Sequence, residues 1–240
     1  MGLGDVAFWE VEALTMAADD ALYYPVMLRL EGQRCLVVGG GGVAARKVRG
    51  LLQAGAQVVV VAPSLEETLQ NQAERGEIEW LPHACRSADL TGSRLVIAAT
   101  DDRQTNEWVA AEAGRLGLWV NVVDRPDLCD FVMPAVLRQG RVVVSVSSGG
   151  SSPALARELR DRLEEVVGPE YGRLAAMLGG LRDEVKGRIR DPRRRVAFWD
   201  AALAGPALRW LRDGRDDLAQ AQLRELLDRF CEGSGEMPCA

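Results

Sequence analysis

Residues 35–54 read CLVVGGGGVAARKVRGLLQA, and this stretch decides the fold. Four apolar residues, 35–38, come directly before four glycines, and a segment with the apolar spacing of a helix follows. The helix is expected to carry its apolar residues on one side: Val43, Val48, Leu51 and Leu52. Gly55 ends it. The stretch therefore predicts a strand, a tight glycine turn and a helix, in that order.

The glycine turn fits the pattern G-x-G-x-x-A, which is typical of dinucleotide-binding sites. Gly39 permits the tight turn, Gly41 lets the backbone approach a pyrophosphate, and Ala44 lets the helix pack closely on the strand. Free N–H groups at the start of the helix then face the phosphates. We predict a dinucleotide site here; the alternative is a glycine turn with a structural role only.

The end of the next strand, 58–61, indicates which dinucleotide binds. Residues 62–64, which follow it, include no acidic group for a ribose 2′-hydroxyl and no arginine for a 2′-phosphate. Glu66 and Glu67 come next and would repel a 2′-phosphate. The sequence thus favours NAD over NADP.

Short apolar strands and helices continue to alternate as far as residue 123. Strands are expected at 78–81, 95–99 and 119–123, and a helix near 105–116. Such alternation predicts βαβ units and an α/β fold with a doubly wound parallel sheet of the Rossmann type.

The pattern changes after residue 124. Strands are expected at 131–133 and 142–146, a helix after Pro153, and only helices from Glu170 onward. We therefore divide the chain as follows: an N-terminal extension (1–22), a NAD-binding Rossmann domain (23–130), a small α/β domain (131–167), a helical C-terminal domain (168–232) and a tail (233–240).

The composition excludes several classes of protein. A net charge of −6 argues against a nucleic-acid-binding protein, and no apolar run approaches the ~18 residues that span a bilayer. Five scattered cysteines indicate free thiols in a reducing compartment, and residues 1–21 lack a secretory signal, so a cytoplasmic protein is expected. One histidine and dispersed cysteines predict no metal site.

A short-chain dehydrogenase would need a Tyr-x-x-x-Lys pair, and no tyrosine in this sequence has that lysine. Carboxylates therefore remain as the candidates for acid–base catalysis. Asp124 ends the strand 119–123, and ligands in open α/β sheets bind beyond the carboxyl ends of strands. Asp101 and Asp102 end a neighbouring strand and are alternatives, with Thr100 near the cofactor. For each aspartate, a role as helix N-cap or turn residue is the other interpretation.

Two further clusters have two interpretations each. The loop 147–153 (SSGGSSP) leads into a helix start and is either an anion site or a capped helix. The basic run from Lys186 to Arg195 is either a site for phosphates or carboxylates, or a solvated helix face.

Taken together, six motifs in the same order resemble one family closely. They are 24–28 (YPVML), 37–47 (VVGGGGVAARK), 99–102 (ATDD), 121–124 (NVVD), 131–134 (FVMP) and 147–153 (SSGGSSP). The family is that of the precorrin-2 dehydrogenases, which also form the N-terminal part of siroheme synthases. The likeness runs from about Tyr23 to Leu203 and includes 193–199 in the helical part.

The resemblance implies NAD-dependent oxidation of precorrin-2 to sirohydrochlorin by an interlocked homodimer, with 131–167 as a dimerisation domain. Some members of the family also insert Fe²⁺ into sirohydrochlorin. The resemblance assigns dehydrogenation to Asp124 and places Gly42, Val43, Pro63 and Ser64 at the cofactor. Together with the residues predicted from the glycine turn and the strand end, the cofactor set is Gly39, Gly41, Gly42, Val43, Pro63, Ser64, Thr100 and Asp101. The set facing the tetrapyrrole is Asn121, Ser148, Gly149 and Gly150.

Residues 1–22 precede the usual start of the family, and the 37 residues after Leu203 are too few for the methyltransferase module of longer siroheme synthases. A stand-alone form is therefore expected.

Two alternative functions stay open. A NAD-sensing module that only oligomerises would bind NAD but no tetrapyrrole. A basic helical protein that binds nucleic acid would show salt-dependent DNA binding through 193–195.

Overall fold

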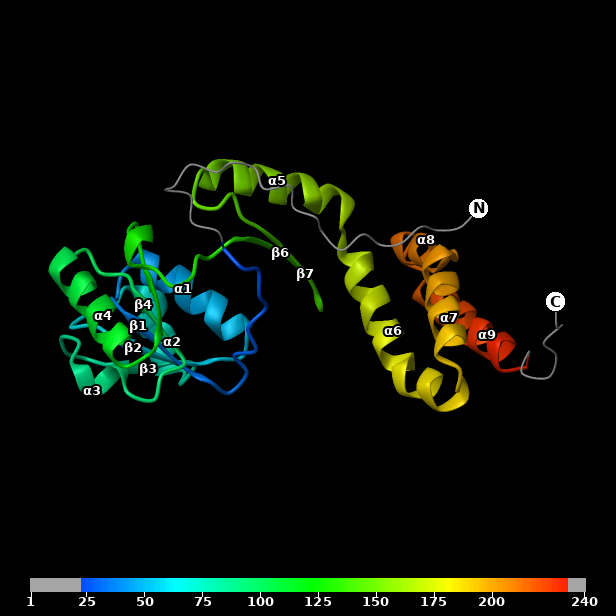
Figure 1. Cartoon of the computed structure of the whole chain (residues 1–240), viewed down its shortest axis with the longest axis horizontal. Helices are drawn as coiled ribbons and strands as arrows, with labels where there is room; N and C mark the ends of the chain where they lie inside the picture. Colours follow the sequence, from blue (N-terminus) through cyan, green and yellow to red (C-terminus); the bar gives the residue numbers. More distant parts are fainter. Residues whose placement is uncertain (1–22, 233–240) are drawn as a thin grey trace. The chain divides into compact units, whose positions relative to one another are not determined.

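The structure is a computed structural model of the chain and describes residues 23–232 (Figure 1). It divides into two compact units, one ending at Met133 and one beginning at Pro134. The segments 1–22 and 233–240, predicted as an extension and a tail, lie outside the described residues. The predicted domain boundaries stay predictions.

A parallel sheet of five strands forms the centre of the first unit. The strands are β1 (Arg34–Val38), β2 (Gln57–Val61), β3 (Glu79–Leu81), β4 (Leu95–Ala98) and β5 (Trp119–Val122). Their order is β3-β2-β1-β4-β5, and all neighbours are parallel. The chain moves outward from β1 to β3 and then crosses back to β4, as in a doubly wound sheet. This confirms the predicted Rossmann-type fold.

Both faces of the sheet are covered by helices, which explains the continuous apolar runs of its inner strands. In β1, Cys35 and Val37 face one core cluster, and Leu36 and Val38 face the other. The first cluster includes α1 (Gly42–Gln53) and α2 (Glu67–Glu74). The second includes α3 (Ser87–Leu90) and α4 (Arg103–Arg115).

The second unit begins with an antiparallel hairpin of β6 (Ala135–Gln139) and β7 (Val142–Val146). The prediction of a strand at 142–146 agrees with β7, whereas the prediction at 131–133 is wrong. The segment 131–133 is instead held by side chains of the first unit, because the amide Nδ2 of Asn121 donates to the carbonyl of Phe131 at 2.9 Å.

Helices make up the rest of the second unit, as predicted. They are α5 (Pro153–Val166), α6 (Pro169–Arg188), α7 (Pro192–Ala204), α8 (Ala207–Arg212) and α9 (Asp216–Glu232). α5 packs on the hairpin, and α6 to α9 share a core that includes Phe198, Leu211 and Leu223. Among residues 23–232, no helix combines the length and the apolar character that crossing a membrane requires.

Candidate functional site

The glycine turn lies at the carboxyl end of β1, between the ends of β2 and β4. Gly39 has a φ of +125°, and a Cβ on it would lie 2.3 Å from the carbonyl oxygen of Ala99. A Cβ on Gly40 would lie 2.0 Å from the carbonyl oxygen of Ser64. Both positions therefore require glycine. The pattern G-x-G-x-x-A predicts a role for Gly39 but none for Gly40, because only the fold brings Ser64 against Gly40.

The start of α1 is open to a ligand. Gly41 is its N-cap, offers no side chain, and has no atom within 4 Å of the place where a Cβ would stand. The first N–H groups of a helix lack partners within the helix, so those of α1 can bind an anion. This geometry fits the pyrophosphate of a dinucleotide.

A cavity of about 890 Å³ opens over the turn. All eight residues predicted to bind the cofactor line it: Gly39, Gly41, Gly42, Val43, Pro63, Ser64, Thr100 and Asp101. They come together because the carboxyl ends of parallel strands meet at one edge of the sheet. The volume and the exposed helix start suit a dinucleotide.

Other residues of this cavity carried no signal in the sequence. Cys85 follows β3, while Gln104, Thr105 and Trp108 come from α4. Glu66 was expected to repel a 2′-phosphate, and it also lines the cavity, whereas Glu67 does not. The N–H of Glu66 donates to the carbonyl of Gly40 at 2.8 Å, which holds this residue against the glycine turn.

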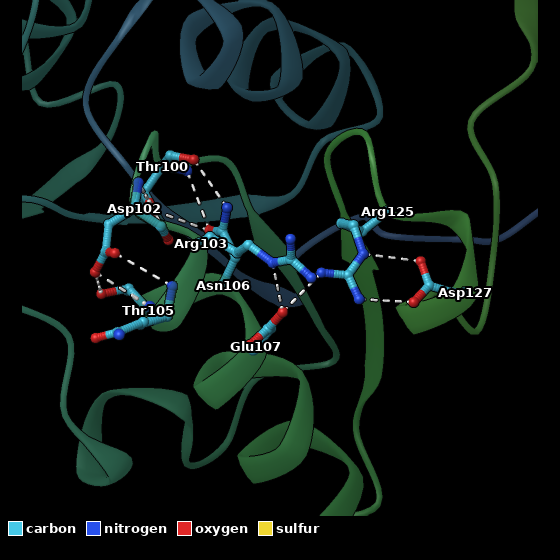
Figure 2. A network of polar contacts seen from close by, with 9 residues as sticks. Thr100, Asp102, Arg103, Thr105, Asn106, Glu107, Arg125 and Asp127 are labelled. Atoms are coloured by element: carbon cyan, nitrogen blue, oxygen red, sulfur yellow. Dashed lines mark hydrogen bonds and ion pairs between the residues drawn. The ribbon is translucent and has the colours of Figure 1, made fainter.

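Both aspartates after β4 line the larger cavity, and Asp102 has a structural role as well. Asp102 is the N-cap of α4 and accepts hydrogen bonds from the N–H groups of Gln104 and Thr105, both at 3.2 Å. The hydroxyl and the N–H of Thr105 lower the pKa of Asp102. The capping interpretation therefore describes Asp102. Asp101 lines the cavity, and Thr100 beside it is held by Asn106 through a side-chain hydrogen bond of 2.9 Å (Figure 2).

Asp124 follows β5 directly and adopts a left-handed backbone, with a φ of 59°. No other non-glycine residue in the described part of the chain has a positive φ. The turn is closed by the N–H of Arg125, which donates to the carbonyl of Val122 at 3.3 Å. Aspartate tolerates this conformation better than most residues, and such backbone strain clusters at functional sites.

A smaller cavity, of about 310 Å³, joins Asp124 to the cofactor set. Val43, Thr100 and Asp101 line it together with Asp124, and all three also line the larger cavity. Within residues 23–232, the Asp124 carboxylate has neither a hydrogen bond nor an ion pair. The structure therefore brings the predicted acid–base group to the predicted cofactor site with its oxygens available.

Arg125 anchors the turn that carries Asp124. Its guanidinium binds both oxygens of Asp127, at 2.9 and 2.7 Å, and Oε1 of Glu107 on α4, at 2.8 Å (Figure 2). Arg103 binds the same Glu107 oxygen at 2.8 Å. The two arginines lower the pKa of Glu107, and Arg125 lowers that of Asp127. This network ties the turn after β5 to α4.

Asn121 is buried, with 7% of its surface exposed. Its amide nitrogen donates to the carbonyl of Phe131 and lies 3.6 Å from Sγ of Cys129. The side chain therefore holds the segment that follows Asp124. Its contact with a substrate stays a prediction.

The predicted tetrapyrrole residues Ser148, Gly149 and Gly150 belong to the second unit and line neither cavity. The hydroxyl of Ser148 accepts from the N–H of Ser152 at 2.9 Å and donates to its carbonyl at 3.0 Å. Ser152 caps α5 through the N–H of Leu155, at 3.2 Å. These bonds agree with the interpretation of the loop 147–153 as a capped helix start. Contact of Ser148, Gly149 and Gly150 with a substrate stays a prediction.

The basic run from Lys186 to Arg195 is partly tied down within the helical core. Arg188 forms ion pairs with Glu184 at 2.9 Å and Asp228 at 2.7 Å. Arg195 donates to the carbonyls of Ile189 and Arg190. These bonds favour the interpretation of the basic run as a solvated helix face over that of a binding site for phosphates or carboxylates.

Metal-ligating side chains do not gather in groups of three or more anywhere in residues 23–232. None of the cysteines in this part of the chain forms a disulfide: Cys35, Cys85, Cys129 and Cys231. Cys239 lies outside the described residues.

Comparison with known families gives matches along most of the chain. Residues 26–135 match a putative NAD(P)-binding family, 139–165 the central region of a sirohaem biosynthesis protein, and 170–227 the dimerisation region of sirohaem synthase. The first match confirms the predicted dinucleotide cofactor and agrees with the cavity over the glycine turn, while the individual binding residues stay predictions.

Curated relatives include siroheme synthases. That of Methylococcus capsulatus is 46% identical over 206 residues, which are 86% of this chain and 44% of the relative. That of Chromobacterium violaceum is 45% identical over 203 residues, which are 85% of this chain and 43% of the relative. The chain thus spans less than half the length of these relatives.

A solved structure has the same architecture. It is titled "SirC, precorrin-2 dehydrogenase", and the match has a TM-score of 0.65 and 25% sequence identity. The match covers 88% of this chain and 100% of that one. The fold is therefore shared over nearly the whole described chain.

Proposed function

We propose, because the chain belongs to the family of the precorrin-2 dehydrogenases and siroheme synthase N-terminal regions, that it oxidises precorrin-2 to sirohydrochlorin with NAD. The family match and the cavity over the glycine turn support NAD as the cofactor. The reaction is a step in siroheme synthesis.

The position of Asp124 is the observation that carries this proposal. Its carboxylate stands beside Val43, Thr100 and Asp101, on a strained turn at the carboxyl edge of the sheet. In the chain's described part it has no internal partner, so its oxygens are available to a ligand. A carboxylate in this state is suited to act as a base.

The oxidation removes two electrons and two hydrogens from precorrin-2. NAD, when bound, accepts one hydrogen as hydride on its nicotinamide ring. The other leaves as a proton, which the Asp124 carboxylate takes and passes to water. The N–H groups at the start of α1 hold the pyrophosphate, and the open space over Gly41 lets it approach.

The chain acts as a homodimer in this proposal. The match of 170–227 to a dimerisation region supports it. So do three large apolar side chains that α5 leaves exposed, Leu155, Leu159 and Val166. We place the enzyme in the cytoplasm, as the cysteine pattern favours.

Insertion of Fe²⁺ into sirohydrochlorin, a lyase reaction, is a second candidate activity of the same site. Pyrrole protons leave as Fe²⁺ enters, and this again requires a base such as Asp124. The test is the absorbance change when Fe²⁺ is added to sirohydrochlorin with and without the protein. Equal rates with and without it would reject this second activity.

Replacing Asp124 tests the main proposal. Asp124→Ala is expected to slow the formation of sirohydrochlorin from precorrin-2 and NAD by about two to four orders of magnitude. NAD affinity, measured by calorimetry, is expected to stay unchanged and serves as the control for folding. Near-normal activity, or a larger loss in Asp101→Asn than in Asp124→Ala, would contradict the role of Asp124.

The NAD-sensing alternative makes a different prediction. Such a module binds NAD but has no site for a tetrapyrrole. Titration of the protein with sirohydrochlorin, followed by absorbance, distinguishes the dehydrogenase from the sensor. The dehydrogenase is expected to bind sirohydrochlorin, its product, whereas the sensor is expected not to bind it.

A further inference from the structure

The cations near Asp124 differ in whether an acidic group already holds them. Arg125, the next residue, is bound by two carboxylates, those of Glu107 and Asp127 (Figure 2). Arg103, which lines the smaller cavity with Asp124, is bound by Glu107 as well. Both arginines therefore have acidic partners inside the protein, which weakens them as binders of an external anion.

Lys47 on α1 is a different case. It lies one helical turn after Val43, which lines both cavities, and its Nζ lies 3.3 Å from Sδ of Met133. The charge of Asp124 also acts on it. A thioether is only a weak acceptor. Among the described residues, no carboxylate forms an ion pair with Nζ of Lys47. An ammonium group thus stands near Asp124 without an acidic partner.

Burial makes this arrangement costly. The side chain of Lys47 is half-buried, and this burial lowers its pKa, while the charge of Asp124 acts in the opposite direction. Lys47 has three N–H donors and, among the described residues, a single weak acceptor in an exposed contact, so its remaining donors are open to an anionic ligand.

The residue type at this position adds a second argument. The chain carries 29 lysines and arginines, and only Lys47 and Lys186 are lysine. A compact ammonium on a flexible stem binds a single carboxylate as a point charge, whereas a guanidinium prefers flat bidentate pairing.

We propose that Lys47 binds a carboxylate of the tetrapyrrole beside Asp124. This inference rests on the proposed function, whose substrate carries several carboxylates around its ring. Lys47 lines neither the cavity over the glycine turn nor the smaller cavity that holds Asp124. In this proposal it binds a carboxylate of the substrate that extends beyond the smaller cavity, and the dinucleotide site stays unchanged.

The test is a titration of the full-length protein with sirohydrochlorin, followed by absorbance. Lys47→Gln is expected to raise the Kd about tenfold or more, the size of effect that loss of a charge-assisted hydrogen bond gives. Lys47→Arg keeps the charge and is expected to recover part of the affinity. NAD affinity is expected to be equal in all variants, which controls for folding.

Arg49→Gln is the matched control. Arg49 is exposed on the same helix, and residues two apart on a helix do not share a face. Its loss removes the same charge and is expected to leave the Kd nearly unchanged. An unchanged Kd in Lys47→Gln, an equal rise in Arg49→Gln, or no binding by the unaltered protein would overturn the inference. If the unaltered protein oxidises precorrin-2 while Lys47→Gln binds normally, the inference alone fails.

Discussion

Gly40 and Gly41 are neighbours in one turn, yet a side chain would meet different obstacles at the two positions. A Cβ on Gly40 would lie 2.0 Å from the carbonyl oxygen of Ser64, so a side chain there conflicts with the protein itself. At Gly41 nothing lies within 4 Å, and φ is −93°, which any residue adopts. A side chain at Gly41 therefore conflicts only with a bound ligand.

This difference predicts opposite behaviour for two alanine variants. Gly40→Ala is expected to lower the free energy of unfolding by about 1–3 kcal/mol, because overpacking forces the backbone to move. Gly41→Ala is expected to leave stability nearly unchanged but to weaken NAD binding, because the pyrophosphate approaches the backbone at this position. Urea unfolding and calorimetry measure the two effects. Equal stability of both variants would contradict the assignment.

At Asp124, part of the site was predictable and part was not. Its place after a strand follows from the local pattern, since an apolar run ends at a polar residue. Its left-handed φ and the pairing of Arg125 with Glu107, 18 residues earlier, depend on how α4 packs beside β5. No local signal encodes such long-range pairing. The availability of Lys47 was not predictable for the same reason.

At Gly172, α6 approaches the hairpin closely. A Cβ on Gly172 would lie 2.5 Å from the carbonyl oxygen of Gln139 and 3.1 Å from the nitrogen of Gly140. Glycine is therefore required where this helix crosses the hairpin turn. Gly180, in the same helix, is exposed and has open space around it.

These two glycines of α6 are expected to respond oppositely to alanine. Gly172→Ala is expected to destabilise the protein by about 1–3 kcal/mol through overpacking. Gly180→Ala is expected to stabilise it by about 0.5–1 kcal/mol, because alanine loses less entropy in a helix. Thermal unfolding followed by circular dichroism checks both signs. A stabilised Gly172→Ala variant would rule out the close packing of α6 on the hairpin.

α3 and α4 are joined through one carboxylate. Glu112 forms an ion pair with Arg115 at 2.7 Å and accepts a hydrogen bond from the hydroxyl of Ser87. These bonds, that of Arg115 first, lower the pKa of Glu112 from 4.5 to about 2. The folded state thus favours the ionised form, so the stabilisation is complete above about pH 4.5 and is lost as the pH falls towards 2.

Glu112→Gln is therefore expected to cost stability at neutral pH and progressively less in acid. Urea unfolding of both proteins at neutral pH and at about pH 3 measures this difference. Arg75→Gln, which removes an exposed ion pair with Glu77, is the control and should change stability little at either pH. A loss in Glu112→Gln that does not depend on pH would contradict the assigned pKa.

The helices and strands were largely predictable from the sequence, with one wrong prediction, the strand at 131–133. β1, β2 and β4 are buried on both faces, so their sequences are apolar apart from the first residue of β1 and of β2, and they are easily identified. The segment 131–133 has the same apolar character but pairs with no strand. It is bound by Asn121 and precedes Pro134, which has no N–H to donate to a ladder. Apolar composition alone does not distinguish these two situations.

At the scale of the whole molecule, two units carry separate parts of the predicted chemistry. The unit ending at Met133 holds the dinucleotide cavity and Asp124, and the one beginning at Pro134 holds the serine–glycine loop. A net charge of −6 describes the surface as a whole and does not describe the site. Near Asp124, the two arginines are paired, and we propose that Lys47 supplies the attraction for an anionic substrate.

The measurement that tests the central claim most directly is the turnover of the unaltered protein with precorrin-2 and NAD in the absence of oxygen. Absorbance follows sirohydrochlorin and NADH together. We predict that both appear at the same rate, one NADH for each sirohydrochlorin, and that both rates fall together in Asp124→Ala. Formation of neither product, or of sirohydrochlorin without NADH, would contradict the assignment as a NAD-dependent dehydrogenase.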